Sequence, residues 1–271
     1  MSYYEELGLV REPFSSSPDP EFFYQSSEHK TALHRLEIAI RLKRGLSLIL
    51  GDVGTGKTTL SRTFLQNLDN EENFVFKLML DPTYKSEFQF LSNLTKMFGV
   101  TPAFRSTLDY KEAIEKYLFK KGVDENKTII LIIDEGQKLS FSFLEILRTL
   151  LNYETNEYKL LQLIVLAQME LLPRIQRIKN FYDRITLKYI INPLDESETQ
   201  EMIRFRLAKS GLSPTRELFE PEAIKLIYEY TLGYPRRIAV MSHNALEHIV
   251  MNDKKKVDRS VIAEIVTREV I

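Results

Sequence analysis

The segment GDVGTGKTTL, from Gly51 to Leu60, constrains the fold of this 271-residue chain more than any other. Its first eight residues match the pattern G-x-x-x-x-G-K-[ST], and they follow the apolar run LSLIL at 46–50. The apolar run predicts a buried strand, and we expect a helix from Lys57 to about Leu68. A strand, a glycine-rich loop and a helix in this order favour a parallel α/β sheet.

The chemistry of this loop suits a bound phosphate. Its glycines permit backbone conformations that aim N–H groups inward, and the following helix adds its positive N-terminal end. Lys57 would reach the outer phosphates of a nucleotide, and Thr58 would offer its hydroxyl to Mg²⁺. The alternative is a glycine-rich turn without a ligand, which the flanking strand and helix disfavour. The nucleotide-binding candidates in the loop are Gly51, Asp52, Val53, Gly54, Thr55, Gly56, Lys57, Thr58 and Thr59.

Strands and helices alternate along most of the chain. We expect strands at 46–50, 74–80, 129–134, 161–168 and 184–190, and helices at 27–44, 57–68, within 87–121, at 140–152 and near 169–178. Continuous apolar strands that alternate with helices predict a parallel sheet covered on both faces. After Pro193 the patterns are those of amphipathic helices with no strand between them.

Three parts follow from this pattern: an N-terminal extension at 1–26, an α/β nucleotide domain at 27–193 and a small all-helical domain at 194–271. The extension has too many turn formers for a regular element, and its aromatic side chains need an anchor. We expect it to flank the nucleotide site, with Pro13, Phe14 and Tyr24 as walls of the base pocket.

Composition excludes several classes of protein. Lys and Arg number 37 against 38 Asp and Glu, so no global positive field draws the chain onto nucleic acid or an acidic membrane, although a local basic patch stays open. The absence of Cys excludes disulfides, thiolate zinc sites and a cysteine nucleophile. The N-terminus carries acidic residues where a signal peptide needs basic ones, and no apolar run approaches the roughly 20 residues of a membrane span. We therefore expect a cytoplasmic protein.

An acidic pair supplies the second motif. Asp134 and Glu135 end the apolar run IILII at 129–133, and a carboxylate at the end of a buried strand next to strand 46–50 would meet the metal held by Thr58. Asp134 is thus the metal-side candidate, and Glu135 is placed to polarise a water for attack on the γ-phosphate. Any strand that ends in Asp-Glu could instead cap the next helix, but the pairing with GDVGTGKT favours catalysis and, within it, hydrolysis.

Three further polar signals have weaker support. Gln168 ends the strand 161–168, and in such a sheet the strand between those of Gly51 and Asp134 delivers a polar side chain beside the γ-phosphate; a solvated glutamine is an equally open alternative. Arg184 precedes the last strand, and Arg236 with Arg237 opens a helix after the tight turn Gly233-Tyr234-Pro235. A lone arginine is usually a surface charge, but an arginine near transferred phosphate strongly accelerates the reaction.

Taken together, these motifs resemble the AAA+ ATPases, a type of P-loop NTPase, and in particular the ATPase module of the general secretion pathway protein A family (ExeA/GspA type), with related ATPases of exopolysaccharide and protein-sorting loci. The resemblance extends over nearly the whole chain and rests on YYEELGLVREPFSSSPDPEFFY, EHKTALHRL, GDVGTGKTT, IILIIDEGQKLS, LEILRTLLNYETNEYKLLQLIVLAQMEL, DRITLKYIINPLDESET and GYPRRI. It implies that Arg184 is an arginine finger for a neighbouring subunit, Gln168 sensor 1, Arg236 or Arg237 the sensor of a lid domain at 194–271, and ATP the nucleotide. The family usually has Gly-Gln where this chain has Ala167-Gln168.

We therefore expect a Mg²⁺-dependent, oligomerising ATPase that drives assembly or switching in a secretion, export or exopolysaccharide system, with a protein partner there. Its catalytic set would be Lys57, Glu135, Gln168 and Arg184, with Thr58 and Asp134 on the metal. An ATP-dependent DNA-binding regulator, similar to transposon target-selection ATPases, is the alternative. A nucleotide-binding module without turnover is disfavoured by Glu135.

Overall fold

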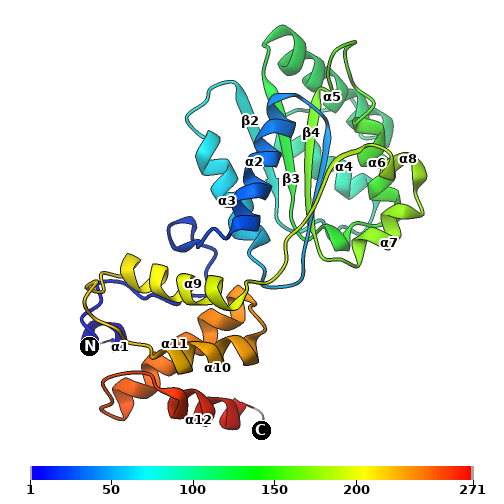
Figure 1. Ribbon diagram of the computed structural model, residues 1–271. Helices are drawn as coiled ribbons and strands as arrows, with labels where there is room; N and C mark the ends of the chain where they lie inside the picture. Colours follow the sequence, from blue (N-terminus) through cyan, green and yellow to red (C-terminus); the bar gives the residue numbers. More distant parts are fainter. Residues whose placement is uncertain (1, 270–271) are drawn as a thin grey trace. The chain divides into compact units, whose positions relative to one another are not determined.

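The computed structural model describes residues 2–269 (Figure 1). The chain forms two compact units. The first, here called the sheet unit, comprises residues 29–52 and 61–191. The second, here called the helical unit, comprises the described residues of 1–28, 53–60 and 192–271, so it gathers the N-terminal segment and part of the glycine-rich loop with the C-terminal helices. Each unit has a buried apolar core of its own.

Five parallel strands build the sheet unit. They are β1 (Leu46–Leu50), β2 (Phe74–Met79), β3 (Thr128–Ile133), β4 (Leu161–Ala167) and β5 (Ile185–Ile190). Their order across the sheet is β2-β3-β4-β1-β5. Each strand begins and ends within one residue of its predicted bounds, so the predicted parallel α/β fold is confirmed.

Burial separates the interior strands of the sheet from the edge strand β5. β1, β3 and β4 are buried along their whole length, whereas β5 alternates between half-buried and exposed residues, as an edge strand does. A strand that is apolar on both faces is stable only between two neighbours and under helices on each side. In the observed order, β4 lies between β3 and β1. The expectation that strand 129–134 is next to strand 46–50 is wrong, and the expectation that strand 161–168 separates them is confirmed.

Helices surround this sheet (Figure 1). They are α2 (Ser27–Arg41), α3 (Lys57–Leu68), α4 (Glu87–Phe98), α5 (Thr107–Phe119), α6 (Phe141–Leu150), α7 (Leu171–Gln176) and α8 (Lys179–Tyr182), with single turns η2 (Lys120–Asp124) and η3 (Gly136–Lys138). Ser86, Ser106 and Ser140 cap α4, α5 and α6 by accepting a backbone N–H of the first turn. Alternate residues of the central strands pack with α4, α5 and α6 into one continuous core.

The helical unit contains α9 (Glu196–Lys209), α10 (Pro221–Thr231), α11 (Pro235–Met251) and α12 (Arg259–Glu269). Proline at the first position of α10 and α11 presets the backbone for a helix and removes an N–H that would have no partner there. These helices confirm the predicted all-helical C-terminal region. Within the described part of the chain, no helix is both long enough and apolar enough to cross a membrane.

The N-terminal segment packs on these helices. It contains two single turns, α1 (Tyr3–Glu6) and η1 (Pro20–Phe22), where no regular element was expected; Asp19 caps η1. Phe14 is 2% exposed and meets Phe219 edge to face at 6.1 Å, and the Tyr24 hydroxyl donates to Glu201 at 2.6 Å. A ring so fully buried has no free face for a nucleotide base. The prediction that Phe14 walls the base pocket is therefore wrong, because its ring is buried in the apolar core.

Candidate functional site

The glycine-rich loop leads from β1 into α3 through two residues in the left-handed region. Gly54 and Gly56 have φ of 85° and 95°, conformations that side chains with a Cβ rarely adopt. Before them, the N–H of Gly51 donates to the carbonyl of Ala167 at 3.2 Å, which places the start of the loop beside the end of β4. α3 begins at Lys57, so Lys57 and Thr58 occupy the first helical turn, at the positive end of the helix dipole. This is the arrangement that holds an anion.

Within the helical unit, the start of α11 contacts this loop. The N–H of Arg236 donates to the carbonyl of Gly54 at 3.3 Å, and a Cβ on Gly54 would lie 3.0 Å from the Cβ of Arg236. The guanidinium of Arg237 lies 5.0 Å from the ring centre of Tyr234 instead. Both predicted sensor arginines are exposed, but Arg236 is the one whose backbone touches the loop.

The turn before α11 depends on Gly233. Its φ is 74°, and a Cβ at this position would come within 1.8 Å of the carbonyl oxygen of Leu194. The carbonyl of Gly233 accepts the N–H of Leu194 at 2.9 Å. The segment that leads into α9 is therefore hydrogen-bonded to the segment that leads into α11. This contact fixes the start of α11, the helix that carries Arg236 and Arg237.

Asp134, Glu135 and Gln168 lie at one edge of the sheet unit, where the parallel strands β3 and β4 end. Asp134 is 4% exposed, and its Oδ1 accepts the N–H of Glu135 at 2.8 Å. Glu135 has φ 53° and ψ 35°, so this non-glycine residue occupies the left-handed region. Such a conformation is costly and typical of functional turns.

Gln137 joins these residues and was missed by the sequence reasoning. Its Nε2 donates to Glu135 Oε2 at 2.7 Å, and its Oε1 accepts the N–H of Gln168 at 3.2 Å. The motif DEGQKLS contains it two residues after Glu135, and this position on the turn was the available signal. Arg174, also missed, donates from Nη1 to the carbonyl of Gln137 at 2.5 Å and from Nη2 to that of Leu139.

Arg184 lies apart from this group. It precedes β5, and Ile185 pairs with Leu46 at the opposite, N-terminal edge of the sheet. Its Nε is buried without a hydrogen-bond partner, and among the residues that the structure describes no ion pair joins it to Asp183. The sheet unit thus brings Asp134, Glu135 and Gln168 together and leaves Arg184 away from them.

The donor set suits Mg²⁺. This ion prefers oxygen ligands and usually takes only one or two from the protein, with water and substrate phosphates as the rest. Among residues 2–269 no cluster of three or more His, Cys, Asp or Glu could hold a metal by itself. Asp134 offers a buried carboxylate, which is the kind of oxygen ligand that such an ion takes from a protein when it arrives with a nucleotide.

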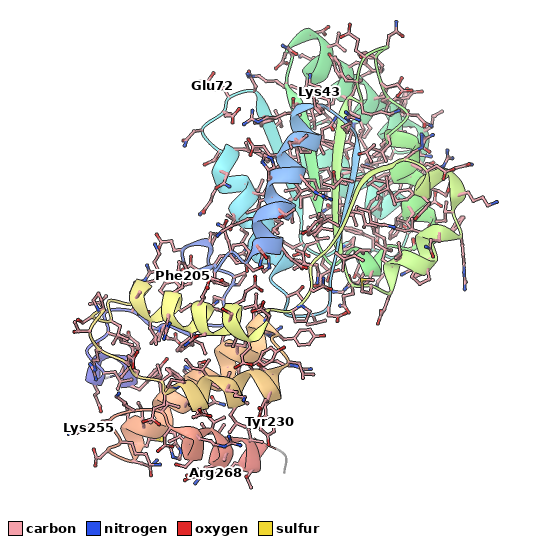
Figure 2. All side chains as sticks on the ribbon, viewed as in Figure 1. Lys43, Glu72, Phe205, Tyr230, Lys255 and Arg268 are labelled. Carbon is pink, nitrogen blue, oxygen red and sulfur yellow. The ribbon has the colours of Figure 1, made fainter. Side chains whose placement is uncertain are left out.

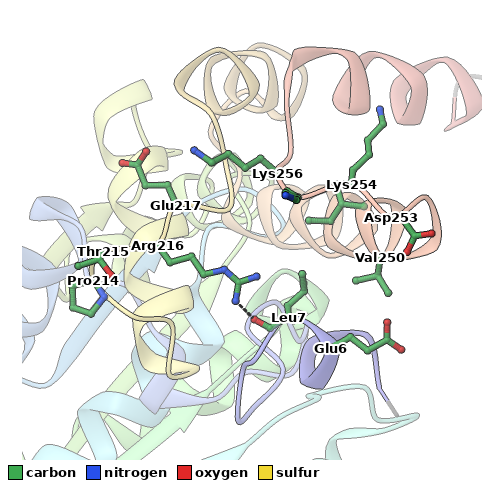
Figure 3. A pocket seen from close by; sticks show the side chains of 12 residues that line it. Glu6, Leu7, Pro214, Thr215, Arg216, Glu217, Val250, Asp253, Lys254 and Lys256 are labelled. Atoms are coloured by element: carbon green, nitrogen blue, oxygen red, sulfur yellow. Dashed lines mark hydrogen bonds between the residues drawn. The ribbon is translucent and has the colours of Figure 1, made fainter.

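A cavity of about 650 Å³ opens in the helical unit between α1, the 214–217 segment and the end of α11 (Figure 3). Arg216 crosses it and donates to the carbonyl of Leu7 at 2.5 Å. The other charged residues that line the cavity are Glu6, Glu217, Asp253, Lys254, Lys255 and Lys256. Of these, Lys255 is labelled in Figure 2. Positive and negative groups nearly balance, and the described lining includes no residue of the glycine-rich loop. This cavity is therefore separate from the candidate phosphate site.

Sequence comparisons place the chain in a family. A family model described as an AAA domain matches residues 40–175, which are about half of the chain. General secretion pathway protein A of Aeromonas hydrophila is 33% identical over 253 residues, which cover 90% of this chain and 44% of that protein. The chain therefore spans less than half the length of this relative.

Solved structures share the fold at low sequence identity. The ORC2 protein of Aeropyrum pernix has a TM-score of 0.68 at 18% identity, covering 95% of this chain and 71% of that one. Drosophila ORC bound to DNA has a TM-score of 0.71 at 18% identity, covering 96% and 64%. RuvB of Thermotoga maritima has a TM-score of 0.60 at 14% identity, covering 94% and 72%.

The AAA domain implies nucleotide binding, in keeping with the loop and the strand-end carboxylates. From the matched domain, this chain belongs to the AAA family of ATPases and is related to general secretion pathway protein A.

Proposed function

We propose that this protein is a Mg²⁺-dependent ATPase that hydrolyses ATP. The observation that carries the proposal is the meeting of Asp134, Glu135 and Gln168 at the sheet edge where Gly51 begins the glycine-rich loop. A loop alone would support nucleotide binding. A carboxylate next to the metal-side aspartate adds a group that acts on water, and water is the acceptor that distinguishes hydrolysis from transfer.

Each residue then has a role based on position and charge. Lys57 and the loop amides hold the phosphates, Thr58 and Asp134 hold Mg²⁺, and Glu135 orients the attacking water with help from Gln168. When bound, Mg²⁺ would supply charge neutralisation to the phosphates. The remaining loop residues, Gly51, Asp52, Val53, Gly54, Thr55, Gly56 and Thr59, shape the cradle.

Two arginines complete the proposal. We assign the lid sensor to Arg236, since its backbone contacts Gly54 while Arg237 turns onto Tyr234. We assign the arginine finger to Arg184, acting on ATP bound by a neighbouring copy in a homo-oligomer. Support comes from its place at the sheet edge opposite Asp134, with a buried Nε that has no hydrogen-bond partner among residues 2–269. The N-terminal segment flanks the nucleotide in this proposal, since it shares a compact unit with residues 53–60.

The work that hydrolysis drives is assigned from the relative. We propose an assembly or switch ATPase with a protein partner in a secretion, export or exopolysaccharide system, because the chain is 33% identical to general secretion pathway protein A. A second candidate is an ATP-dependent DNA-binding regulator. It is favoured by the three consecutive lysines at 254–256, for which no ion pair is present within residues 2–269. Duplex-DNA binding with and without a slowly hydrolysed ATP analogue, across a salt series, separates the two candidates.

Paired variants test the enzymatic proposal. Lys57→Ala should abolish binding of a fluorescent ATP analogue, because it removes a contact to ground-state phosphates. Glu135→Gln should bind the analogue as the wild type does and lose turnover, because it removes only the group that acts on water. Near-wild-type affinity in Lys57→Ala, or normal turnover in Glu135→Gln, would reject the assignment. The Glu135→Gln protein also serves as a trap for capturing the partner.

A further inference from the structure

The side chain of Gln137 bridges two parts of the candidate catalytic edge. Its amide contacts the carboxylate of Glu135 at 2.7 Å on one side and the backbone N–H of Gln168 at 3.2 Å on the other. The N–H of Gln168 can only donate, so the amide oxygen must face it. The amide nitrogen must then face Glu135, where a carboxylate can only accept. Chemistry therefore allows one orientation of this amide, and both of its ends are engaged.

The backbone that carries Gln137 is fixed against β4. Arg174 on α7 donates to the carbonyls of Gln137 and Leu139 on both sides of the turn. Gly136 packs so closely that a Cβ there would lie 2.5 Å from Val165 Cγ1 and 3.1 Å from the carbonyl of Leu166. The amide of Gln137 is thus held from two directions, and it cannot follow Glu135 if that side chain swings away.

Glu135 needs such a support. Its own backbone is in the left-handed region, and its carboxylate sits at the end of a flexible side chain. Oε2 is engaged by Gln137, and the described residues provide no partner for the other carboxylate oxygen. One oxygen is therefore fixed by the protein while the second is left for a water molecule. A general base works only when its oxygen is held within hydrogen-bond reach of that water.

We propose that Gln137 is a positioning residue that fixes the carboxylate of Glu135 and ties it to the end of β4 at Gln168. The proposal deepens the ATPase function given above and rests on it. Because the bridge runs from the strand end that carries Gln168, any shift of that strand end moves the carboxylate with it. Gln137 acts through Glu135 and contacts neither nucleotide nor metal in this role.

Gln137→Met tests the bridge, because methionine has a similar shape and neither donates nor accepts a strong hydrogen bond. We expect kcat to fall about 10–100-fold, as for a catalytic group displaced by about 1 Å, with ATP affinity within about twofold of the wild type. Gln137→Glu keeps an acceptor for Gln168 and places a negative oxygen against Glu135, so it should lose at least as much. This second variant decides the matter if Gln137→Met does not fold.

Lys138→Ala is the matched control in the same turn. Lys138 is exposed and pairs with Asp81 at 3.1 Å, away from Glu135, and this pairing, after a larger contribution from the Thr83 hydroxyl, keeps the pKa of Asp81 below its ordinary value. Its kcat should be unchanged. In a Glu135→Gln background, adding Gln137→Met should lower turnover no further, since the group it positions is already gone.

The outcomes separate the two proposals. Wild-type kcat in folded Gln137→Met and Gln137→Glu, a faster enzyme, or a loss confined to ATP affinity would overturn the positioning role while leaving the ATPase intact. Full additivity with Glu135→Gln would also overturn it, because it would show an effect that does not pass through Glu135. A wild-type protein that binds ATP and never hydrolyses it would overturn the proposed function itself, and the positioning role with it.

Discussion

Replacing Arg184 with alanine should stop hydrolysis without affecting the binding of ATP by the same chain. The reason is distance along the sheet. Ile185 pairs with Leu46, and the glycine-rich loop begins five residues later at Gly51, about 16 Å away at ~3.3 Å per residue. An extended arginine side chain reaches roughly 7 Å from its Cα. Arg184 therefore falls well short of phosphates held at the other edge of its own sheet.

The expected magnitude follows from the role. An arginine finger contributes about 10³–10⁵ in rate, so kcat of Arg184→Ala should fall at least ~10³-fold while the affinity for an ATP analogue changes little. The exposed Arg177 just upstream is a matched control, because its replacement by alanine removes the same charge from the same region and should leave kcat unchanged. Wild-type specific activity should rise with protein concentration, because the finger acts only in an assembly.

Mixing two inactive proteins gives the sharper assay. Arg184→Ala has an intact loop, and Lys57→Ala has an intact finger. In a random equimolar mixture, about a quarter of the head-to-tail interfaces combine the intact loop of one with the intact finger of the other. Activity should therefore return to roughly a quarter of the wild-type value. No recovery in a mixture shown to co-assemble, or a kcat of Arg184→Ala equal to that of Arg177→Ala, would refute the reasoning.

Two further predictions concern the stability of the fold. Gly233→Ala should lower the free energy of unfolding by at least ~2 kcal/mol, because the new Cβ would clash with the carbonyl oxygen of Leu194. Gly99 has a similar φ of 73° and no atom within 4 Å of the position of a Cβ, so Gly99→Ala should lower it by only about 1 kcal/mol. Equal losses in urea titrations would contradict the predicted clash. Asp258 accepts a hydrogen bond from the Ser260 hydroxyl at 2.6 Å and one from the N–H of Val261 at 2.9 Å, which keep its pKa below the ordinary 3.8. The stabilisation by the Asp258 carboxylate is complete above pH 3.8 and is lost as pH falls through the lowered pKa. Asp258→Ala should therefore lower the free energy of unfolding by about 1 kcal/mol at neutral pH and by almost nothing in strong acid, as measured by thermal unfolding at both pH values. A loss of stability that does not depend on pH would contradict this prediction.

Local patterns were sufficient to predict the strands of the sheet. The strands at 46–50 and 161–167 are continuous apolar runs, and such runs have one stable environment, the middle of a parallel sheet. The loop at 51–58 was equally readable, because its glycines and Lys57 act through nearby backbone. The wrong placement of strand 129–134 beside strand 46–50 has a clear cause. Both β3 and β4 are buried throughout, so burial alone does not say which of the two pairs with β1.

The residues of the candidate site likewise divide into those that the sequence could identify and those that it could not. Asp134, Glu135 and Gln168 could be selected because each ends an apolar strand, and parallel strands deliver their ends to one edge. Gln137 had only its place two residues after Glu135 as a signal, and Arg174 had none, because the contacts with Gln168 and Arg174 join residues 31 to 37 positions apart and depend on how the turn at 136–138 lies against β4. Phe14 was misassigned for a related reason, since its partner Phe219 is distant in sequence and an exposed wall and a core residue look alike in a polar, aromatic segment.

The sequence by itself determined the strand and helix positions, the phosphate-type loop and the acidic pair, because each depends on side-chain periodicity or on chemistry within a few residues. Only the tertiary structure decided the place of β4 between β3 and β1, the left-handed backbone of Glu135 with its bridge through Gln137, and the position of Arg184 at the far edge of the sheet. These features arise from contacts between segments distant in sequence, and such contacts are selected by the packing of the whole sheet and its helices, which no local pattern encodes.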